Sequence, residues 1–405
     1  MKEILLRYAL VPLCILAIAG CAGTAITPPA AAVTPSSEAM QRLPVDKYPE
    51  FTDDAPVESL KQAIERNMRY LNALKDGHTF RYGEDTYTAG EIKDSLQYFA
   101  LILDAAKGDT NALNRFIRED FTVYAAAGSD AQGKVYYTGY YVPELNGSRT
   151  KGGRYIYPLY ALPKDMVRVE LGMFAEKYKG EKIVGRVEEG RLVPYYTHEE
   201  IYKGALAGKG LELLWVDSRV DLFFLQVQGS GTVRLDDGGV INVTYAGANG
   251  HRYRPAGRVL VDEEKIPLSE ISLQSIKRYL AEHPEDVDRV LFYNPSYVFF
   301  RESGESAIGS TGVSLVDGRA VATDRKIFPQ GALLYVSTQR SEFAEDASVS
   351  GQSQLRRFAL NQDTGGAIIG PGRADFFWGR GKESELQAGH MKYYGTLYFL
   401  VKKKK

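Results

Sequence analysis

Apolar residues recur at helical spacing in a few stretches of the chain, and most of the other apolar residues form short runs. The clearest helical stretch spans residues 56–75, where apolar side chains stand three or four positions apart and Gly77 follows as a stop. The same spacing predicts further helices over residues 91–107, 199–207 and 272–282. Their apolar positions are typical of side chains that pack into a core.

Short runs rich in β-branched and aromatic residues make up most of the rest. The run from Val135 to Val142, Val-Tyr-Tyr-Thr-Gly-Tyr-Tyr-Val, is the clearest predicted strand. Similar runs predict strands over residues 154–162, 221–228, 240–245, 298–300, 333–337, 357–360 and 395–401. The 40 glycines and 27 tyrosines fit a turn-rich β protein. We therefore expect a mainly β protein with two β domains and peripheral helices.

Residues 1–20 have the pattern of an export signal. Lys2 and Arg7 supply its positive charge, and the apolar stretch of residues 9–19 is too short to span a bilayer comfortably. The stretch runs into Cys21 in a pattern similar to a bacterial lipobox, which predicts a lipoprotein signal peptide and a lipid on Cys21. An ordinary secretory signal, cut near a small residue, is the alternative.

The residues after the signal predict a protein attached to the cell envelope. Ala22, rather than an aspartate, follows the cysteine, and resemblance to enteric lipoproteins then implies an outer-membrane lipoprotein facing the periplasm. Residues 21–50 are rich in Ala, Pro, Ser and Thr and predict a flexible tether. The basic tail of residues 401–405 predicts a solvated end, with contact to anionic lipid or polymer as the alternative.

Charge and cysteine content exclude several kinds of site. With 50 basic and 51 acidic residues the formal net charge is −1, so no basic field predicts a nucleic-acid partner. The two cysteines are Cys14, removed with the signal, and Cys21, so the mature chain has no disulfide and no catalytic thiolate. The sequence contains no Cys/His metal cluster and no phosphate loop, and we expect neither a metal nor a cofactor.

Two aspartates near the C-terminus are the strongest candidates for chemistry. Asp363 precedes a Thr-Gly-Gly sequence, and Asp375 is followed directly by Phe-Phe-Trp. Because a carboxyl group is costly to bury among apolar residues and its pKa rises there, this context predicts a carboxylic acid that donates a proton. For Asp363, a structural role in a glycine turn is equally open.

The triplet Asp363-Thr364-Gly365 also matches the signature of aspartic proteases. Their mechanism needs two such aspartates sharing one proton. The chain contains no second Asp-Thr/Ser-Gly triplet, and it is far longer than the single-lobe proteases that build the pair by dimerising. The sequence therefore disfavours an aspartic protease.

Several segments, in order through most of the mature chain, resemble one family, the membrane-bound lytic murein transglycosylases of type A. The matching segments are residues 137–141 (Tyr-Thr-Gly-Tyr-Tyr), 157–160, 192–197, 227–231, 245–251, 294–300 and 322–325, followed by the two-aspartate segment. The C-terminal part also resembles the 3D domain, named for three aspartates, which here would be Asp324, Asp363 and Asp375. Any one segment is a weak signal, but the ordered set is specific.

The resemblance implies a double-psi β-barrel domain with a smaller inserted β-barrel domain. The main domain would comprise residues 51–141 and 256–400, with the helices at its periphery, and the insert residues 142–255. A long groove between them would bind the glycan strands of peptidoglycan. The implied enzyme is a lytic exotransglycosylase, which cuts between N-acetylmuramic acid and N-acetylglucosamine and leaves a 1,6-anhydromuramic end.

Such a reaction can proceed with a single acid. The muramyl C6 hydroxyl attacks C1 within the same sugar, so no second carboxylate is needed to activate water. Asp375 matches the family's catalytic position, and we expect it to have a raised pKa and an apolar wall made by Phe376, Phe377 or Trp378. Asp363 would be the supporting acid, and Asp324 would be catalytic or purely structural.

Six polar residues in the matching segments are predicted sugar contacts. They are Thr138, Tyr140, Gln228, Ser230, Tyr245 and Asn249. Each also has a structural interpretation, because a strand ending in a Gly-Ser turn, an Asn-Gly turn and packed tyrosines would explain the same residues.

Two other functions fit the same motifs. A non-catalytic peptidoglycan-binding lipoprotein would use the fold without the reaction, and a conventional glycoside hydrolase would use Asp363 and Asp375 as acid and base. The expected partners are peptidoglycan strands, a membrane reached through lipid on Cys21, and proteins of cell-wall synthesis or hydrolysis.

Overall fold

The computed structural model describes residues 37–305 and 307–404. The predicted signal peptide of residues 1–20, the lipidation site Cys21 and residues 21–36 of the predicted tether lie outside these residues. Among the helices that the structure describes, none is long and apolar enough to cross a membrane.

The end of the predicted tether is part of the fold. β1 (Met40–Arg42) pairs with β4 (Phe121–Ala126), and the hydroxyl of the buried Tyr48 donates to the Phe121 carbonyl at 3.0 Å. The prediction of a flexible segment up to residue 50 is therefore wrong for residues 40–48, because Met40 and Tyr48 bury apolar surface that composition alone does not weigh.

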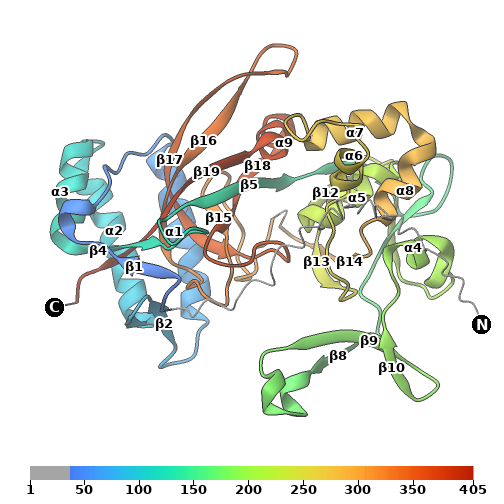
Figure 1. Ribbon diagram of the computed structural model, residues 1–405, viewed down its shortest axis with the longest axis horizontal. Helices are drawn as coiled ribbons and strands as arrows, with labels where there is room; N and C mark the ends of the chain where they lie inside the picture. The colour runs from blue at the N-terminus through green and yellow to red at the C-terminus, as the bar shows by residue number, and fades with distance from the viewer. Residues whose placement is uncertain (1–36, 306, 405) are drawn as a thin grey trace, which may run out of the picture. The chain divides into compact units, whose positions relative to one another are not determined.

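A closed ring of strands forms the main barrel (Figure 1). Its strands are β5 (Val135–Val142), β15 (Ala320–Ala322), β16 (Leu333–Phe343), β17 (Val349–Asp363), β18 (Arg373–Arg380) and β19 (Lys392–Lys402). They pair in the order β19-β16-β17-β15-β18-β5, and β5 pairs back to β19. The β15–β17 and β18–β5 pairs are parallel, and β4 and β1 extend the sheet from β19.

Alternation along the strands separates the barrel core from the outer positions. In β5, Val135 and Tyr137 are fully buried, while Tyr136 and Thr138 are only half-buried. Helices α1 (Val57–Asn72), α2 (Ala89–Ala106) and α3 (Thr110–Asp120) and the hairpin of β2 (Thr79–Tyr82) and β3 (Asp85–Thr88) add apolar side chains to the same core. A capping box between Thr88 and Glu91 starts α2.

The second barrel is built from a separate sheet. Its strands are β6 (Glu144–Ser148), β7 (Tyr157–Tyr160), β11 (Glu212–Val216), β12 (Ser230–Leu235), β13 (Val240–Ala248) and β14 (Val298–Ser303). The order is β14-β13-β12-β6-β11-β7, and a bridge from Ala161 to Phe300 brings the end of β7 back to β14. Because β14 lies beyond residue 255 yet pairs with β13, we place residues 298–303 with the insert.

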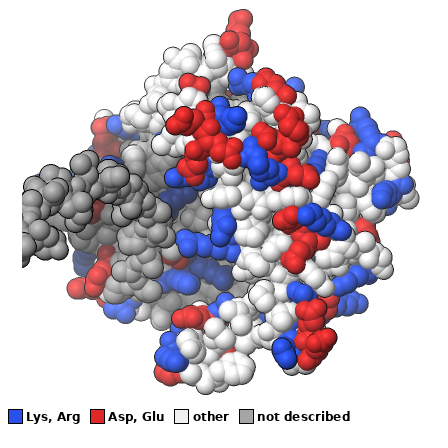
Figure 2. Space-filling model, turned by 45° about the vertical axis from the view of Figure 1, so that its right-hand side comes forward, with Lys and Arg blue, Asp and Glu red and all other residues white. Residues whose placement is uncertain are grey.

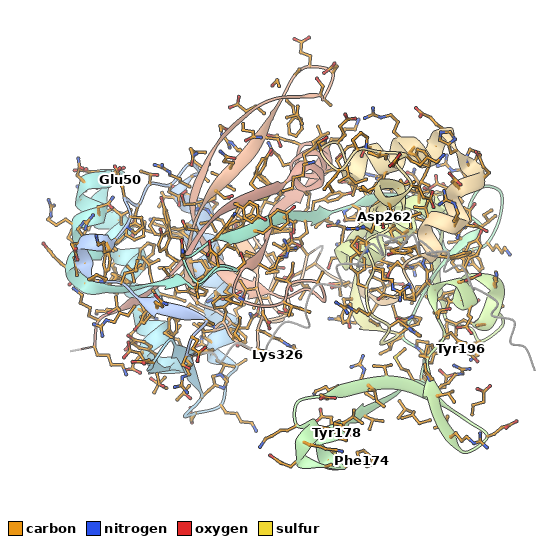
Figure 3. All side chains as sticks on the ribbon, in the orientation of Figure 1. Glu50, Phe174, Tyr178, Tyr196, Asp262 and Lys326 are labelled. Atoms are coloured by element: carbon orange, nitrogen blue, oxygen red, sulfur yellow. The ribbon has the colours of Figure 1, made fainter. Side chains whose placement is uncertain are left out.

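A third sheet extends from the insert as an arm (Figure 1). It consists of β8 (Val167–Glu170), β9 (Lys182–Glu188) and β10 (Arg191–Pro194), all antiparallel, with short 3-10 turns between β8 and β9. Phe174 and Tyr178 lie in those turns, at the free end of the arm (Figure 3).

One predicted strand is a helix. Residues 221–228 belong to α5 (Arg219–Gln228), which starts at the Ser218 N-cap and ends at Gly229 with a φ of 81°. The apolar run of α5 resembles that of a buried strand, because the helix is buried on two sides. Leu222 and Leu225 pack into the insert barrel, and the phenylalanines between them pack into a helical cluster.

The structure contains more helices than the sequence pattern predicts. α7 (Leu273–Glu282) matches the prediction, and the predicted helix at residues 199–207 is α4 (His198–Glu200) continued by a π-turn over Ile201–Ala205. The prediction missed α3, α5, α6 (Gly257–Asp262), α8 (Val287–Phe292) and α9 (Gly381–His390). α6 and α8 are six residues each, too short for a clear periodic signal.

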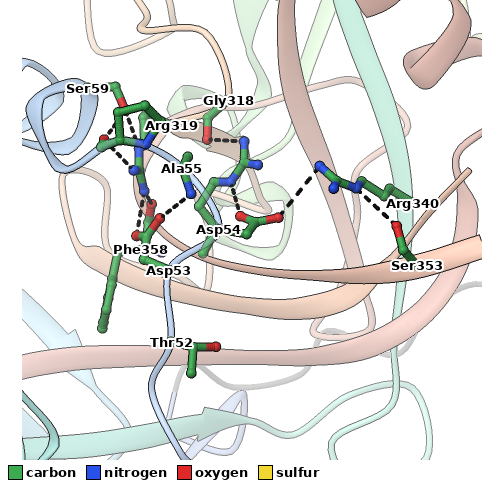
Figure 4. A network of polar contacts seen from close by, with 12 residues as sticks. Thr52, Asp53, Asp54, Ala55, Ser59, Gly318, Arg319, Arg340, Ser353 and Phe358 are labelled. Atoms are coloured by element: carbon green, nitrogen blue, oxygen red, sulfur yellow. Dashed lines mark hydrogen bonds and ion pairs between the residues drawn. The ribbon is translucent and has the colours of Figure 1, made fainter. Parts of the chain in front are cut away.

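A buried arginine fastens the N-terminal segment to the barrel (Figure 4). Arg319 is fully buried and directly precedes β15. Its guanidinium donates to the Asp53 carboxylate and the Phe358 carbonyl, both at 2.7 Å, and to the hydroxyl of Ser59 and the carbonyl of Pro56. Arg357 pairs with the neighbouring Asp54 at 2.6 Å.

We expect Arg319→Ala to lower the free energy of unfolding by about 3–5 kcal/mol, because it leaves the Asp53 carboxylate without its buried partner. Denaturant unfolding followed by tryptophan fluorescence measures the effect. The control is Arg340→Ala, which removes a more exposed arginine 3.8 Å from Asp54 and should cost less than about 1 kcal/mol. Equal losses in the two variants would contradict this account of the network.

Candidate active site

The strand register brings the two predicted acids to one place. Asp363 ends β17 and Asp375 lies in β18, and each is the register partner of Ala322 on the β15 strand between them. With strands about 4.8 Å apart, the two backbones are therefore separated by roughly 10 Å. Residues of three strands thus form one site at this end of the barrel.

Asp375 is held by residues of its own strand and of β5. The Thr138 hydroxyl, directly opposite in the parallel pair, donates to Asp375 Oδ1 at 2.8 Å. Arg373 Nη2 donates to the Thr138 hydroxyl oxygen at 3.2 Å, and Nη1 donates to the Tyr136 carbonyl. Burial raises the pKa of Asp375 to about 6. The hydrogen bond from Thr138 and the positive charge of Arg373 lower the same pKa, but they do not cancel the effect of burial.

The aromatic residues after Asp375 lie on two faces of the strand. Phe377 lies two positions after Asp375, on the same face of β18. It packs against Tyr140 with ring centroids 5.0 Å apart, and the two rings form an apolar wall on that face. Phe376 faces the barrel core, where it packs against Trp378 at 5.1 Å. Of the three predicted wall residues, Phe377 is therefore the one that alternation places beside Asp375.

Asp363 has a different set of donors. Its Oδ1 accepts backbone N–H groups from Ser310 at 2.9 Å and from Thr364 at 2.8 Å. Burial raises the pKa of Asp363 to about 6, the two N–H groups lower it, and the charge of Asp375 raises it. The buried Tyr140 hydroxyl lies beside this carboxyl without meeting hydrogen-bond geometry, and it has no partner among the described residues.

The environments of the two acids suit different roles. Both aspartates are half-buried residues, and burial raises the pKa of each carboxyl group. Backbone N–H donors favour the charged form of a carboxyl group, and Asp363 has two of them. Asp375 accepts one hydroxyl and faces Phe377, an arrangement that suits the protonated member of the pair.

Asp324 makes the contacts of a structural residue. Its Oδ1 accepts the Lys326 N–H at 3.0 Å, and Oδ2 accepts the Gly370 N–H at 2.9 Å. The carboxylate therefore fixes the loop that connects Asp363 to Asp375. The side chain is buried, and both oxygens are used. These contacts support the structural alternative for Asp324.

The predicted sugar contacts differ in their availability. Tyr245 is 50% exposed, and Gln228 and Ser230 are half-buried. Gln228 Oε1 accepts the Tyr141 N–H at 3.0 Å. The Ser230 hydroxyl forms a hydrogen bond with the Thr244 hydroxyl. Thr138 is engaged with Asp375, and Tyr140 is part of the wall beside the acids.

Asn249 is not available to a sugar. It is 1% exposed, its amide N–H₂ donates to the carbonyls of Tyr196 and Pro295, and its amide oxygen accepts N–H groups from His251 and Tyr297. The side chain therefore has a structural role, as a strong turn residue can have.

Three further residues border the acids. Arg373 shares the face of Asp375 two positions earlier, so strand alternation could have identified it. Ser310 and Tyr253 come from loops distant in sequence. Burial and the negative charge of Asp375 raise the pKa of Tyr253 to about 12. No local sequence signal identifies either residue.

Comparison with known proteins identifies the family of the chain. Residues 136–301 match the model of the MltA specific insert domain, and residues 319–401 match the 3D domain. Membrane-bound lytic murein transglycosylase A of Escherichia coli is 31% identical over 333 residues, which are 82% of this chain and 80% of that protein. The chain belongs to the membrane-bound lytic murein transglycosylase A family.

Solved structures of the family have the same fold. A membrane-bound lytic murein transglycosylase from Agrobacterium tumefaciens superposes with a TM-score of 0.72 at 30% identity, covering 90% of this chain and 98% of that one. E. coli MltA with bound chitohexaose gives a TM-score of 0.69 at 26% identity, covering 92% and 96%. The predicted double-psi barrel with a smaller inserted barrel is thereby confirmed.

We expect Asp375→Asn to stabilise the protein at neutral pH. The folded-state pKa is raised from 3.8 to about 6, so the penalty for ionising Asp375 is absent below pH 3.8, grows up to about pH 6 and is constant above it. The variant should gain about 1–3 kcal/mol in unfolding free energy at pH 7.5, and less at pH 4.5.

Denaturant unfolding at the two pH values measures this gain. The control is Asp346→Asn, because hydrogen bonds from Ser348 lower the pKa of that exposed carboxyl and its replacement should not stabilise. A gain for Asp375→Asn that is as large at pH 4.5 as at pH 7.5 would contradict the raised pKa.

Proposed function

We propose that this protein is a lytic murein transglycosylase that cleaves the MurNAc-β-1,4-GlcNAc bond of peptidoglycan and leaves 1,6-anhydromuramic ends. The observation that carries the proposal is Asp375, held by Thr138 beside an apolar wall, in a chain of this family. The chitohexaose bound by E. coli MltA supports a glycan as the ligand.

In the proposed reaction Asp375 acts first as an acid. Its proton passes to the oxygen that links muramyl C1 to the next sugar, and the C1–O bond breaks. Because burial raises the pKa of Asp375 to about 6, a substantial share of the enzyme has the proton at mildly acidic pH. The Thr138 hydroxyl orients the carboxyl toward the bond.

Asp375 then acts as a base. The muramyl C6 hydroxyl attacks C1 and forms the anhydro ring, and its proton passes to the Asp375 carboxylate, which restores the acid. Water is not consumed, since the nucleophile is already part of the substrate. Asp363, bonded by two N–H groups that favour its charged form, stabilises the positive charge that develops at C1.

A two-aspartate hydrolase remains the second candidate, because both acids have a raised pKa and border the same site. It would produce reducing ends instead of anhydro ends. A non-catalytic binding protein would produce neither.

The proposal includes attachment to the outer membrane through lipid on Cys21, with the enzyme facing the periplasm. Family membership supports association with a membrane. The Ala22 residue after the cysteine supports the outer membrane. Interaction with other cell-wall proteins stays a prediction of the resemblance.

We expect purified protein beginning after Cys21 to release anhydro-muropeptides from peptidoglycan, and Asp375→Asn to release at least 1,000-fold less, since the variant has no proton to donate. Mass spectrometry of the products measures both. Glycan binding by the variant should persist, which excludes misfolding. Reducing ends from the wild type would favour the hydrolase instead.

We expect Thr138→Val to move the alkaline limb of the kcat/KM profile to higher pH, because it removes a hydrogen bond that lowers the pKa of Asp375. Thr138→Ser, which keeps the hydroxyl, is the matched control and should retain the wild-type profile. An unchanged limb, or one moved to lower pH, would argue against Asp375 as the acid that titrates.

A further inference from the structure

A row of aromatic and basic side chains leads away from Asp375 across the outer side of the main barrel. β5 pairs with β18 on one side and with β19 on the other, so residues in register on the three strands share a face. Thr138 is the register partner of Asp375. Two residues earlier on β5, Tyr136 lies between Arg373 of β18 and Tyr394 of β19.

Direct contacts join these residues from the acid outward. Arg373 donates to the Thr138 hydroxyl at 3.2 Å, and its guanidinium lies over the Tyr136 ring, 5.0 Å from the centroid. The ring centroids of Tyr136 and Tyr394 are 5.1 Å apart. Because Thr138 also donates to Asp375, an unbroken series of contacts runs from the acid to Tyr394. Two strand spacings and two residues along the strand put the backbones of Asp375 and Tyr394 roughly 12 Å apart.

The series of contacts ends at an open cavity. Tyr394 is 56% exposed and lines a cavity of about 500 Å³, which lies where the pairing of β16 with β19 ends. Hydroxyl and amide groups make up much of the remaining lining, from Ser337, Thr338, Gln339, Gln354 and Thr396. An exposed ring beside uncharged polar groups suits a sugar, because the C–H face of a pyranose packs on an aromatic ring while its hydroxyls need hydrogen-bond partners.

The Tyr394 ring is available to such a ligand. Its neighbour Tyr393 packs against the barrel core, and strand alternation places Tyr394 on the opposite face. The ammonium group of Lys134 lies over the Tyr394 ring, 4.2 Å from the centroid, and Lys134 is itself exposed. A sugar can therefore take the place of this side chain without disturbing the core.

The charge of the protein also fits an uncharged ligand. Figure 2 shows acidic and basic side chains interspersed with wide uncharged areas on the face in view, and the formal net charge of the chain is −1. Stacking and hydrogen bonds to neutral groups, rather than a strong field of one sign, are then the means of recognising a long glycan.

We propose that Tyr394 and its cavity form a distal subsite for the glycan strand. The subsite would bind a sugar further along the strand than the two that flank the bond cleaved by Asp375. The inference rests on the proposed function and specifies the length of strand that the site prefers. A strand long enough to reach Tyr394 would bind more tightly than a short one, with Tyr136 supporting the Tyr394 ring.

Tyr394→Ala tests the subsite, in Asp375→Asn protein so that no cleavage interferes with the measurement. Calorimetry gives the Kd for chitohexaose, which can span both the acids and Tyr394, and for chitotriose, which can bind beside the acids without reaching Tyr394. We expect the Kd for chitohexaose to rise about tenfold and the Kd for chitotriose to change less than about twofold. Tyr394→Phe, which keeps the ring, should retain the affinity for chitohexaose.

A matched control and a direct reporter make the result specific. Tyr178→Ala removes a tyrosine that is also exposed and also has a lysine over its ring, but it lies in the turns of the arm, and neither Kd should change. Tyr394→Trp keeps a ring and adds a fluorescent probe. Its emission should change saturably with chitohexaose, beyond any change seen in the Tyr394 parent.

An unchanged Kd for chitohexaose in Tyr394→Ala, or an equal loss for both oligomers, would overturn the distal subsite. A loss of the same size in Tyr178→Ala, or no added emission change in Tyr394→Trp, would do so as well. Failure of the wild type to release anhydro products would instead overturn the proposed function and would leave the binding results as they are. The two failures are therefore distinguishable.

Discussion

The candidate active site depends on a buried ion pair that never touches it. Arg319 holds Asp53, Ser59 and Phe358 together and immediately precedes β15, the strand that faces both acids. The cost of burying a guanidinium is met only when every donor has an acceptor. That requirement holds the start of β15 in place, and β15 in turn lies between β17 and β18, where Ala322 pairs with Asp363 and Asp375.

The same register creates a tension between stability and chemistry. A carboxyl group that remains protonated at mildly acidic pH needs a poorly hydrated position, and such a position disfavours the folded protein once the group ionises. Thr138 and Arg373 relieve part of that cost at Asp375, and backbone N–H groups relieve part of it at Asp363. If hydrogen bonds stabilised both carboxylates fully, the folded protein would be more stable. The two carboxyl groups would then be weaker proton donors.

Local signals predicted more of the fold than of the site. β5 matches the predicted run from Val135 to Val142 because its alternation and its burial coincide. α5 was predicted as a strand because burial on two sides removes the helical period. The two acids can be recognised from their neighbours in sequence. Ser310 and Tyr253, in contrast, approach the acids only through tertiary folding. Asn249 lies in a motif that predicts a sugar contact, but its side chain has a structural role.

The pairing of β18 with β5 also constrains how the chain can fold. Thr138 and Asp375 are 237 residues apart, and closing so long a loop carries a large entropic cost. The strands of the insert sheet, from β6 to β14, all lie between these two partners in sequence. If the insert forms first, it shortens the effective loop, and the insert then helps the main barrel to close.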